Sequence, residues 1–224
     1  MIKIFRKIIY CNKGIFNLAV GTLNLINKLK RGNQHNCVKN KGFGKIKKDI
    51  IGTHNEILVE QDTFMLFPYV KIRGNNNKLH IKRNCSIGPN CSFWMEGDGI
   101  SIEIGEGTTF TETCHINAQE NGKKIIIGKD CMFSNSIIVR TSDSHPILDK
   151  SSGERINFAG DIVIGEHVWI APKTSVYKGV HIGTGSIIGS NSLVTHDVPD
   201  YSIAVGMPAK TIKTNVCWTR DKLF

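Results

Sequence analysis

The 224-residue chain is 40% hydrophobic and 21% charged, a composition typical of a soluble globular domain with a short appendage. It has neither a run of about 18 apolar residues nor a signal-peptide pattern, so we expect no membrane span. We expect the protein in the cytoplasm, either free or peripheral at the inner membrane. The net charge of +10 is uneven, because residues 1–50 carry +11 and the remainder carries −1.

Residues 1–50 are predicted to form a basic, partly helical arm and linker. Apolar residues at spacings of three and four through residue 30 predict a helix, although Gly14 and Gly21 allow two shorter ones. Residues 31–50 are predicted to be a flexible basic linker. The arm could cap the fold, or it could bind an anionic membrane surface or an anionic polysaccharide. We expect no nucleic-acid partner.

A six-residue repeat dominates the chain from residue 58. Triplets of apolar anchors start at positions 58, 81, 104 and 127 with a constant step of 23, and then at 164 and 182. Small residues recur four positions after the anchors. This pattern predicts three short strands per coil, stacked into a triangular prism over residues 51–213, with one long loop at 140–163 and a tail at 214–224. The anchors of the first four coils are Leu58, Phe64, Val70, Ile81, Ile87, Phe93, Ile104, Phe110, Ile116, Ile127, Phe133 and Val139.

The cysteines and histidines do not have the spacing of a metal site. Cys85, Cys91, Cys114 and Cys131 each stand four positions after an anchor, where a compact apolar side chain points inward. No histidine lies within ten residues of His115, and a catalytic zinc needs three protein ligands. We therefore expect no bound metal.

His145 differs from the other histidines because it lies in the longest interruption of the repeat and is followed by Pro146. A loop held by a rigid scaffold is a typical place for catalysis, and imidazole is suited to general-base chemistry near neutral pH. The alternative is a solvated loop histidine with no catalytic role.

The repeat, the His145-Pro146 pair and the segment Gly206-Met207-Pro208-Ala209-Lys210 resemble the hexapeptide-repeat acyltransferases. Within that family the sequence is most similar to the capsular polysaccharide and polysialic acid O-acetyltransferases. The resemblance implies an all-β, left-handed parallel β-helix that forms a homotrimer with active sites between subunits. It also implies acetyl-CoA as the co-substrate and no metal.

The resemblance further assigns roles to individual residues. His145 would be the general base, with Trp169 and Thr111 in the acceptor cleft, although Trp169 could instead pack at a subunit contact. Apart from the resemblance, an imidazole base needs a group that orients it, and either Asp143, which we also place in the acceptor cleft, or a loop carbonyl could serve. Pro172 departs from relatives that have a candidate oxyanion N–H at that position, and Thr111 replaces an Asn. The residues implied for acetyl-CoA binding are Trp169, Ala171, Pro172, Ser190, Thr195, Lys210 and Lys213.

The function expected from these features is transfer of acetyl from acetyl-CoA to a sugar hydroxyl in a bacterial surface polysaccharide. The acceptor would be a capsule, which could contain sialic acid, or an O-antigen. Acetylation of a small xenobiotic, as in the streptogramin and chloramphenicol branches, would use the same base. A non-catalytic β-helix scaffold is the third alternative, although it would not require the His-Pro loop.

Overall fold

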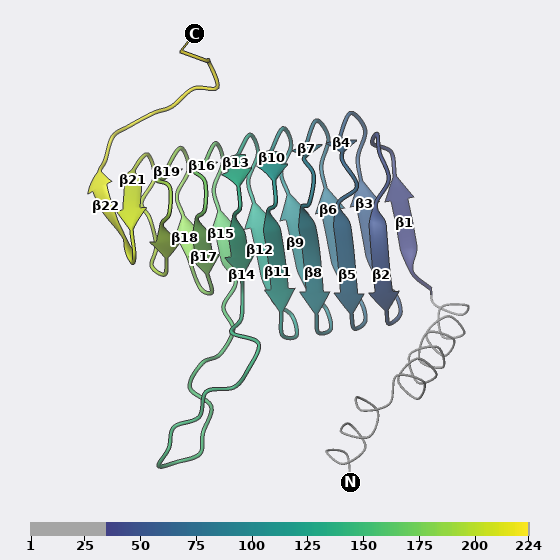
Figure 1. Ribbon diagram of the computed structural model, residues 1–224. Helices are drawn as coiled ribbons and strands as arrows, with labels where there is room; N and C mark the ends of the chain where they lie inside the picture. Colours follow the sequence, from purple (N-terminus) through teal and green to yellow (C-terminus); the bar gives the residue numbers. More distant parts are fainter. Residues whose placement is uncertain (1–34, 224) are drawn as a thin grey trace, which may run out of the picture. The chain divides into compact units, whose positions relative to one another are not determined.

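The computed structural model describes residues 35–223 as a parallel β-helix whose three sheets form the faces of a prism (Figure 1). Sheet A contains β1 (Cys37–Asn40), β3 (Glu56–Val59), β6 (Lys78–Ile81), β9 (Ser101–Ile104), β12 (Lys124–Ile127), β15 (Ile162–Ile164) and β18 (His181–Ile182). Sheet B contains β4 (Phe64–Met65), β7 (Ser86–Ile87), β10 (Thr109–Glu112), β13 (Met132–Asn135), β16 (Trp169–Ile170), β19 (Ile187–Ile188), β21 (Ile203–Gly206) and β22 (Ala209–Lys213). Sheet C contains β2 (Lys47–Ile51), β5 (Tyr69–Arg73), β8 (Ser92–Glu96), β11 (His115–Gln119), β14 (Ile138–Arg140), β17 (Ser175–Tyr177) and β20 (Leu193–Val194).

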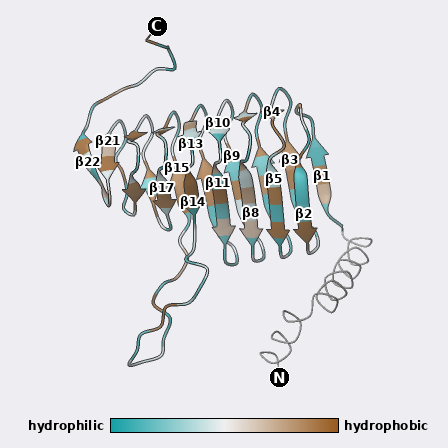
Figure 2. Ribbon diagram, viewed as in Figure 1, coloured by the Kyte–Doolittle hydropathy of each residue, from teal (hydrophilic) through white to brown (hydrophobic). Residues whose placement is uncertain are grey.

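The anchors from residue 81 onward stack in register and fill the interior of the prism. Ile81 pairs with Ile104, and Ile127 pairs with Ile164, so each anchor rests on the equivalent anchor of the next coil. Phe110 and Phe133 stack with ring centroids 4.6 Å apart, and both are buried. Figure 2 shows hydrophobic residues recurring along the strands, with hydrophilic residues between them. The six-residue spacing thus produces one continuous apolar core.

The four repeat cysteines point inward, as predicted. Cys85, Cys91, Cys114 and Cys131 are all buried and none is in a disulfide. Burial raises the pKa of Cys85 to about 11 and that of Cys131 to about 12. These two thiols stay protonated at neutral pH and serve as small apolar groups rather than as nucleophiles.

The first coil corrects two predicted anchors. Val59 pairs with Ile81 and Met65 pairs with Ile87, so the inward positions are Val59 and Met65 rather than Leu58 and Phe64. Phe64 is 50% exposed, whereas Met65 is 2% exposed. The third face of this coil follows after five residues instead of six, and a shift of one residue moves a side chain to the other face of a strand.

The prism also begins earlier than residue 51. Strands β1 and β2 add a further coil, since Val38 pairs with Ile57 and Lys48 pairs with Val70. Residues 36–50 are therefore part of the β-helix and not a flexible linker, because their backbone continues the sheet hydrogen bonding and Ile46 and Ile50 pack against the core. The helix predicted within residues 1–30 lies outside the described residues. Residues 35–223 include no helix long and apolar enough to cross a membrane.

Two segments leave the prism. The loop between β14 and β15 projects away from the body, and the tail follows β22 (Figure 1). The tail is not detached, because Trp218 is 8% exposed and stacks on His167 with ring centroids 4.0 Å apart. Arg220 fastens the tail further by an ion pair with Asp130 at 2.7 Å.

Candidate active site

The projecting loop that carries His145 is a short antiparallel hairpin. Leu148 and Arg155 form a bridge, and Ile156 N donates to Ile147 O at 2.9 Å. At its tip, Asp149 accepts hydrogen bonds from the Ser151 hydroxyl and from the Ser152 backbone N–H. The hydrogen bond from the Ser151 hydroxyl is the largest of the effects that lower the pKa of Asp149 to about 2. The loop has internal structure of its own and is not an irregular excursion.

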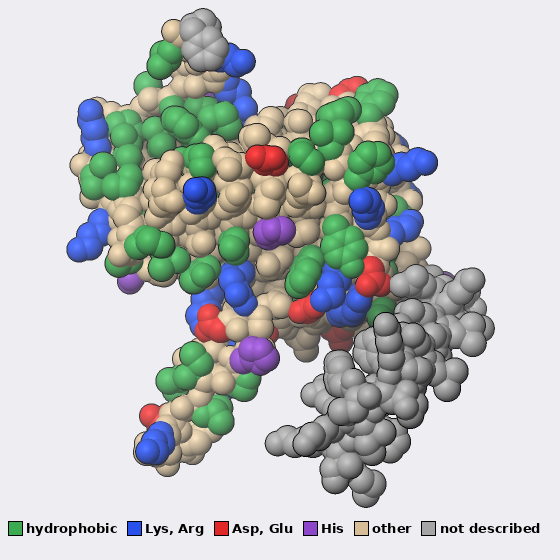
Figure 3. All heavy atoms as spheres, in the orientation of Figure 1, with side chains coloured by type: hydrophobic (Ala, Val, Ile, Leu, Met, Phe, Trp, Pro, Cys, Tyr) green, Lys and Arg blue, Asp and Glu red, His purple; other side chains and the backbone are tan. Residues whose placement is uncertain are grey.

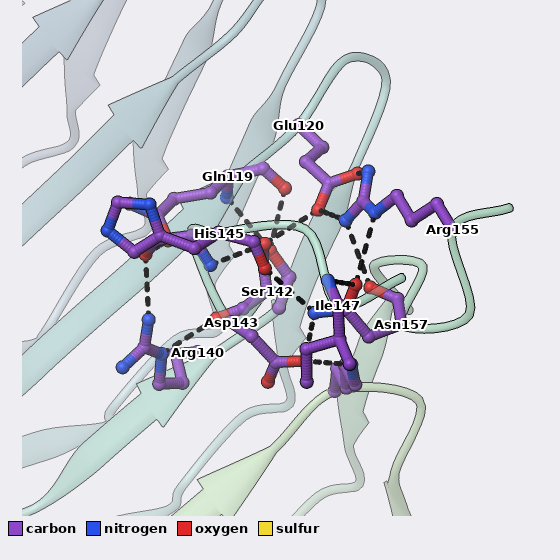
Figure 4. Close-up of polar contacts among 12 residues, drawn as sticks. Gln119, Glu120, Arg140, Ser142, Asp143, His145, Ile147, Arg155 and Asn157 are labelled. Carbon is purple, nitrogen blue, oxygen red and sulfur yellow. Dashed lines mark hydrogen bonds and ion pairs between the residues drawn. The ribbon is translucent and has the colours of Figure 1, made fainter. Parts of the chain in front are cut away.

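Asn157 connects the two sides of this loop next to His145. Its Nδ2 donates to Asp143 Oδ2 at 2.8 Å and to His145 O at 2.9 Å. Its Oδ1 accepts from Ile147 N at 2.7 Å. The side chain is buried, and these bonds fix the backbone on both sides of the His145-Pro146 peptide (Figure 4).

Arg155 and Glu120 anchor the loop to the prism. The guanidinium makes two hydrogen bonds to the carboxylate, at 2.8 and 2.6 Å. Ser142 Oγ donates to the same carboxylate at 2.6 Å. The Arg155 hydrogen bonds are the main cause that lowers the pKa of Glu120 to about 2. Glu120 therefore stays ionised at any physiological pH, and this bidentate geometry defines the orientation of the loop.

The residue before His145 is held from the other side. Arg140 donates to Ser142 O and to Ser144 Oγ, both at 2.8 Å. Ser144 Oγ in turn donates to Gln119 Oε1 at 2.7 Å. Ser144 has a φ of 68°, a left-handed conformation that needs such support in a non-glycine residue. The backbone that enters His145 is thus constrained on both flanks.

The imidazole of His145 is exposed and has no hydrogen-bond partner among residues 35–223. It points away from Asp143 and Asn157 (Figure 4). The carboxylate of Asp143 instead accepts from Asn157 and forms an ion pair with Lys178, whose hydrogen bond is the main reason that the pKa of Asp143 is lowered. Asp143 therefore does not orient the His145 ring within this chain. Both ring nitrogens remain available to bind an external group or to accept its proton.

The other predicted site residues lie on different parts of the prism. Trp169 starts β16 and Thr111 lies in β10, both in sheet B, where Thr111 is exposed. Ala171 and Pro172 follow β16, and Ser190 follows β19, so they share the corner after sheet B on adjacent coils. Thr195 follows β20 of sheet C, and Lys210 and Lys213 are exposed on β22.

One chain does not bring all of these residues together. The His145 loop connects sheet C to sheet A, whereas Trp169 and Thr111 lie on sheet B. The N–H of Ala171 donates to Ile188 O at 2.9 Å, and that of Lys173 donates to Asn135 O at 2.9 Å. The two N–H groups that flank Pro172 are thus used in the coil itself, and neither serves as a free oxyanion donor.

Trp169 has a neighbour that the sequence pattern did not reveal. Its ring lies 6.0 Å from the ring of Trp218 in the tail, centroid to centroid. The Nε1 of Trp169 is buried without a hydrogen-bond partner in the described chain. Trp218 belongs to no repeat, so only its aromatic character could have suggested that it packs here. Asn157, Arg155 and Glu120 were also missed, because no local pattern indicates their contacts.

Within residues 35–223 no group of three or more His, Cys, Asp or Glu side chains is arranged to hold a metal ion. His115 Nδ1 lies 2.7 Å from Ser92 Oγ, and His80 Nε2 lies 2.7 Å from Glu60 Oε1. Each of these histidines is engaged with one polar neighbour and not with a ligand cluster.

The fold and the loop define a class of protein, a parallel β-helix built from hexapeptide repeats with a histidine on its longest loop. Residues 161–196 match the model of the bacterial transferase hexapeptide (six repeats) family. The chain is 31% identical over 173 residues to the polysialic acid O-acetyltransferase of Neisseria meningitidis, covering 76% of this chain and 78% of the relative.

A second relative is the polysialic acid O-acetyltransferase of Escherichia coli O1:K1, 38% identical over 129 residues, which cover 54% of this chain and 39% of the relative's length. Among solved structures, the polySia-specific acetyltransferase NeuO superposes with a TM-score of 0.75 at 34% identity, covering 85% of this chain and 81% of that chain. The chain belongs to the hexapeptide-repeat acetyltransferase family, and its fold is the left-handed parallel β-helix of that family.

Proposed function

We propose that the protein is an O-acetyltransferase that moves an acetyl group from acetyl-CoA to a sugar hydroxyl of a bacterial surface polysaccharide. The observation that carries the proposal is the imidazole of His145, exposed and unpaired among residues 35–223 on a loop whose backbone is fixed by Asn157, Arg155 and Arg140. A rigid backbone with a free base is suited to proton removal from an incoming hydroxyl.

In the proposed mechanism His145 takes the proton of the sugar hydroxyl as its oxygen attacks the thioester carbonyl. Acetyl-CoA supplies the activated acyl group. The same imidazole then returns the proton to the departing sulfur, so no covalent enzyme intermediate is needed. The buried and protonated Cys85 and Cys131 agree with this direct route. The oxyanion donor would come from outside the 171–173 segment, whose N–H groups are already used.

The corner that contains Ala171, Pro172 and Ser190 is proposed to bind pantetheine. Two adjacent coils meet there, since Asn191 N donates to Pro172 O at 2.9 Å, so the corner continues along the prism axis. Lys210 and Lys213 are exposed on β22 and would meet the CoA phosphates. Trp169 and Thr111, on sheet B, would line the cleft.

We propose a homotrimer in which each active site lies between two subunits. Two features support it. His145 and Trp169 are on different faces of one prism, so a complete site needs a second copy. The loop also exposes four large apolar side chains that a neighbouring subunit would cover: Ile147, Leu148, Ile156 and Phe158. Figure 3 shows hydrophobic side chains at the surface of the projecting segment.

The proposed acceptor is a polymer with acidic sugars, such as the polysialic acid of the two curated relatives. The experiment is thiol release from acetyl-CoA by the purified full chain with a panel of acceptors: polysialic acid, other bacterial capsules, O-antigen, chloramphenicol and a streptogramin. Acetyl ester formation on a polysaccharide alone supports the proposal. Turnover with the drugs alone would replace it with xenobiotic acetylation, and no turnover with any acceptor would favour a scaffold.

A further inference from the structure

A cavity of about 400 Å³ lies on the outer face of sheet C, away from the residues assigned above. Its walls come from strands β2, β5, β8 and β11 and from the corners that precede them. The residues that bear on the argument are Lys47, Phe67, Tyr69, Ser92, Trp94 and His115. On the face of β5, β8 and β11, Figure 3 shows hydrophobic side chains beside basic ones.

The cavity combines aromatic surfaces with polar groups. Phe67, Tyr69 and Trp94 provide aromatic surfaces, and the C–H faces of sugars pack well on such rings. Ser92 Oγ and His115 Nδ1 are 2.7 Å apart, which fixes the imidazole and leaves its Nε2 without a partner in the described chain. Pockets that bind small molecules are usually lined by aromatic and apolar side chains with a few oriented polar groups.

Among the lining residues, Lys47 carries a positive charge and none is acidic. Lys47 has no ion-pair partner within residues 35–223, and its Nζ lies 5.9 Å from the Phe67 ring centroid. The acidic groups on the neighbouring strands are neutralised, because Asp49 pairs with Arg73 at 2.5 Å and Glu96 pairs with Lys71 at 2.6 Å. A carboxylate on the ligand would give Lys47 the partner that the protein does not supply.

Sheet C also connects the cavity to the loop. His115 on β11 pairs with Ile138 on β14, and β14 ends directly before the loop that carries His145. Adjacent strands are about 4.8 Å apart, so a polymer that follows the stack from β5 to β14 would reach the base of the loop within a few strand widths.

We infer that this cavity binds a carboxylated sugar unit of the acceptor polymer, with Lys47 as the carboxylate partner and Trp94 as an aromatic wall. The ammonium of Lys71 lies 4.1 Å from the Trp94 ring centroid, so the sugar would contact the part of the ring that lines the cavity. The inference rests on the proposed function, because it adds a recognition site for the same acceptor. Lys47 and Trp94 are then specificity-determining residues, and neither takes part in the proton transfer assigned to His145.

The test measures binding separately from catalysis. Polysialic acid is titrated into the full chain without acetyl-CoA, with neutral dextran as the control polymer. Lys47→Gln is expected to raise the Kd for polysialic acid about fivefold, and Trp94→Ala roughly tenfold. The matched control is Lys48→Gln, which makes the same charge change on the same strand. Lys48 pairs with the inward Val70 and so lies on the opposite side of the strand from the cavity. The Kd of Lys48→Gln for polysialic acid is therefore expected to stay within twofold of the wild-type value.

Three results with the variants would overturn the inference. These are an unchanged Kd in both Lys47→Gln and Trp94→Ala, an equal loss in Lys48→Gln, and a change of oligomeric state in Lys47→Gln, which would make the cavity a subunit contact. A lack of polysialic acid binding by the unaltered chain would also overturn it. Acetyl transfer to the polymer together with an unchanged Kd would refute this inference and leave the proposed function intact.

Discussion

Asn157 is the residue whose replacement tests most directly how the loop holds His145. Asn157→Ala removes the two bonds from Nδ2, to the Asp143 carboxylate and to His145 O, and also the bond from Ile147 N to Oδ1. A typical hydrogen bond contributes about 1 kcal/mol, and one to a charged group contributes more. The local loss is therefore about 3 kcal/mol, equivalent to roughly a 100-fold change in the population of the ordered loop. The prism itself should keep its stability, because the loop lies outside the stacked core.

The assay compares acetyl transfer, amide hydrogen exchange and thermal unfolding for the wild type, Asn157→Ala and Ser151→Ala. The Ser151 substitution is the loop control, because that side chain is exposed at the hairpin tip and bonds only within the turn. We expect kcat to fall between tenfold and 100-fold in Asn157→Ala and exchange to accelerate at Ile147, with the main unfolding transition unchanged. If Asn157→Ala keeps slow exchange at Ile147 and transfers acetyl within twofold of the wild type, the loop network does not position the base.

Three further predictions concern the same site. His145→Ala should fold and assemble normally but lose roughly 10²–10⁴-fold in transfer rate, and near-normal turnover would contradict its role as the base. Trp169→Ala should raise the KM for acetyl-CoA or for the acceptor. If each assembled oligomer instead keeps its activity while sedimentation shows that the subunits associate more weakly, Trp169 packs at a subunit contact. The Glu120–Arg155 contact should stabilise the loop fully above pH 4.5 and lose its effect as pH falls through about 2, because the pKa of Glu120 is depressed from its usual 4.5. Loop protection against proteolysis by pepsin should decline across that window in the wild type and decline less in Glu120→Gln, where Asp143 and Asp149, whose pKa values are also lowered, still titrate in the loop. An equal decline in both proteins would exclude Glu120 as a cause.

The regular part of the fold was predictable because each coil repeats the same physical requirement. An apolar anchor every six residues and a small residue four places later fill a narrow triangular interior, so Ile104, Ile127 and Cys131 could be placed from spacing alone. The first coil could not be placed in this way. Leu58 and Phe64 fit the count of six, but the corner before Tyr69 is one residue shorter, and only sheet pairing reveals that difference.

The candidate site was predictable in part. The position of His145 followed from the interruption of the repeat, since a conspicuous insertion in a regular scaffold is visible in sequence. The residues that hold the His145 loop in place could not be predicted. The Arg155–Glu120 contact joins residues 35 positions apart, and Asn157 acts through the backbone groups His145 O and Ile147 N. Asp143 was one of two candidates to orient the imidazole, the other being a loop carbonyl, and the structure shows its carboxylate paired with Lys178 of the next coil instead.

The last prediction concerns the N-terminal arm, whose extent the structure revises. Residues 36–51 form the further coil of β1 and β2, so deleting residues 1–50 would remove β1 and most of β2, and a loss of charge could not be separated from a loss of stability. The informative variant lacks residues 1–34 only. That segment contains seven Lys or Arg and no acidic residue. Each basic residue near an anionic membrane contributes about 1 kcal/mol, so three engaged side chains would already change binding by about 100-fold.

We expect the shortened protein to acetylate a short soluble acceptor at nearly the wild-type rate. Its binding to anionic vesicles, or its use of a long anionic polymer, should be weaker, and the advantage of the full chain should shrink as salt rises, since screening shortens the reach of exposed charges. Vesicle flotation at low and high salt and acetylation of short and long acceptors measure these effects. Unfolding of the shortened protein, or its dissociation to monomers, would make the arm a structural cap. If the shortened and full-length proteins bind vesicles and acetylate the long polymer equally well at low salt, the arm has no electrostatic role.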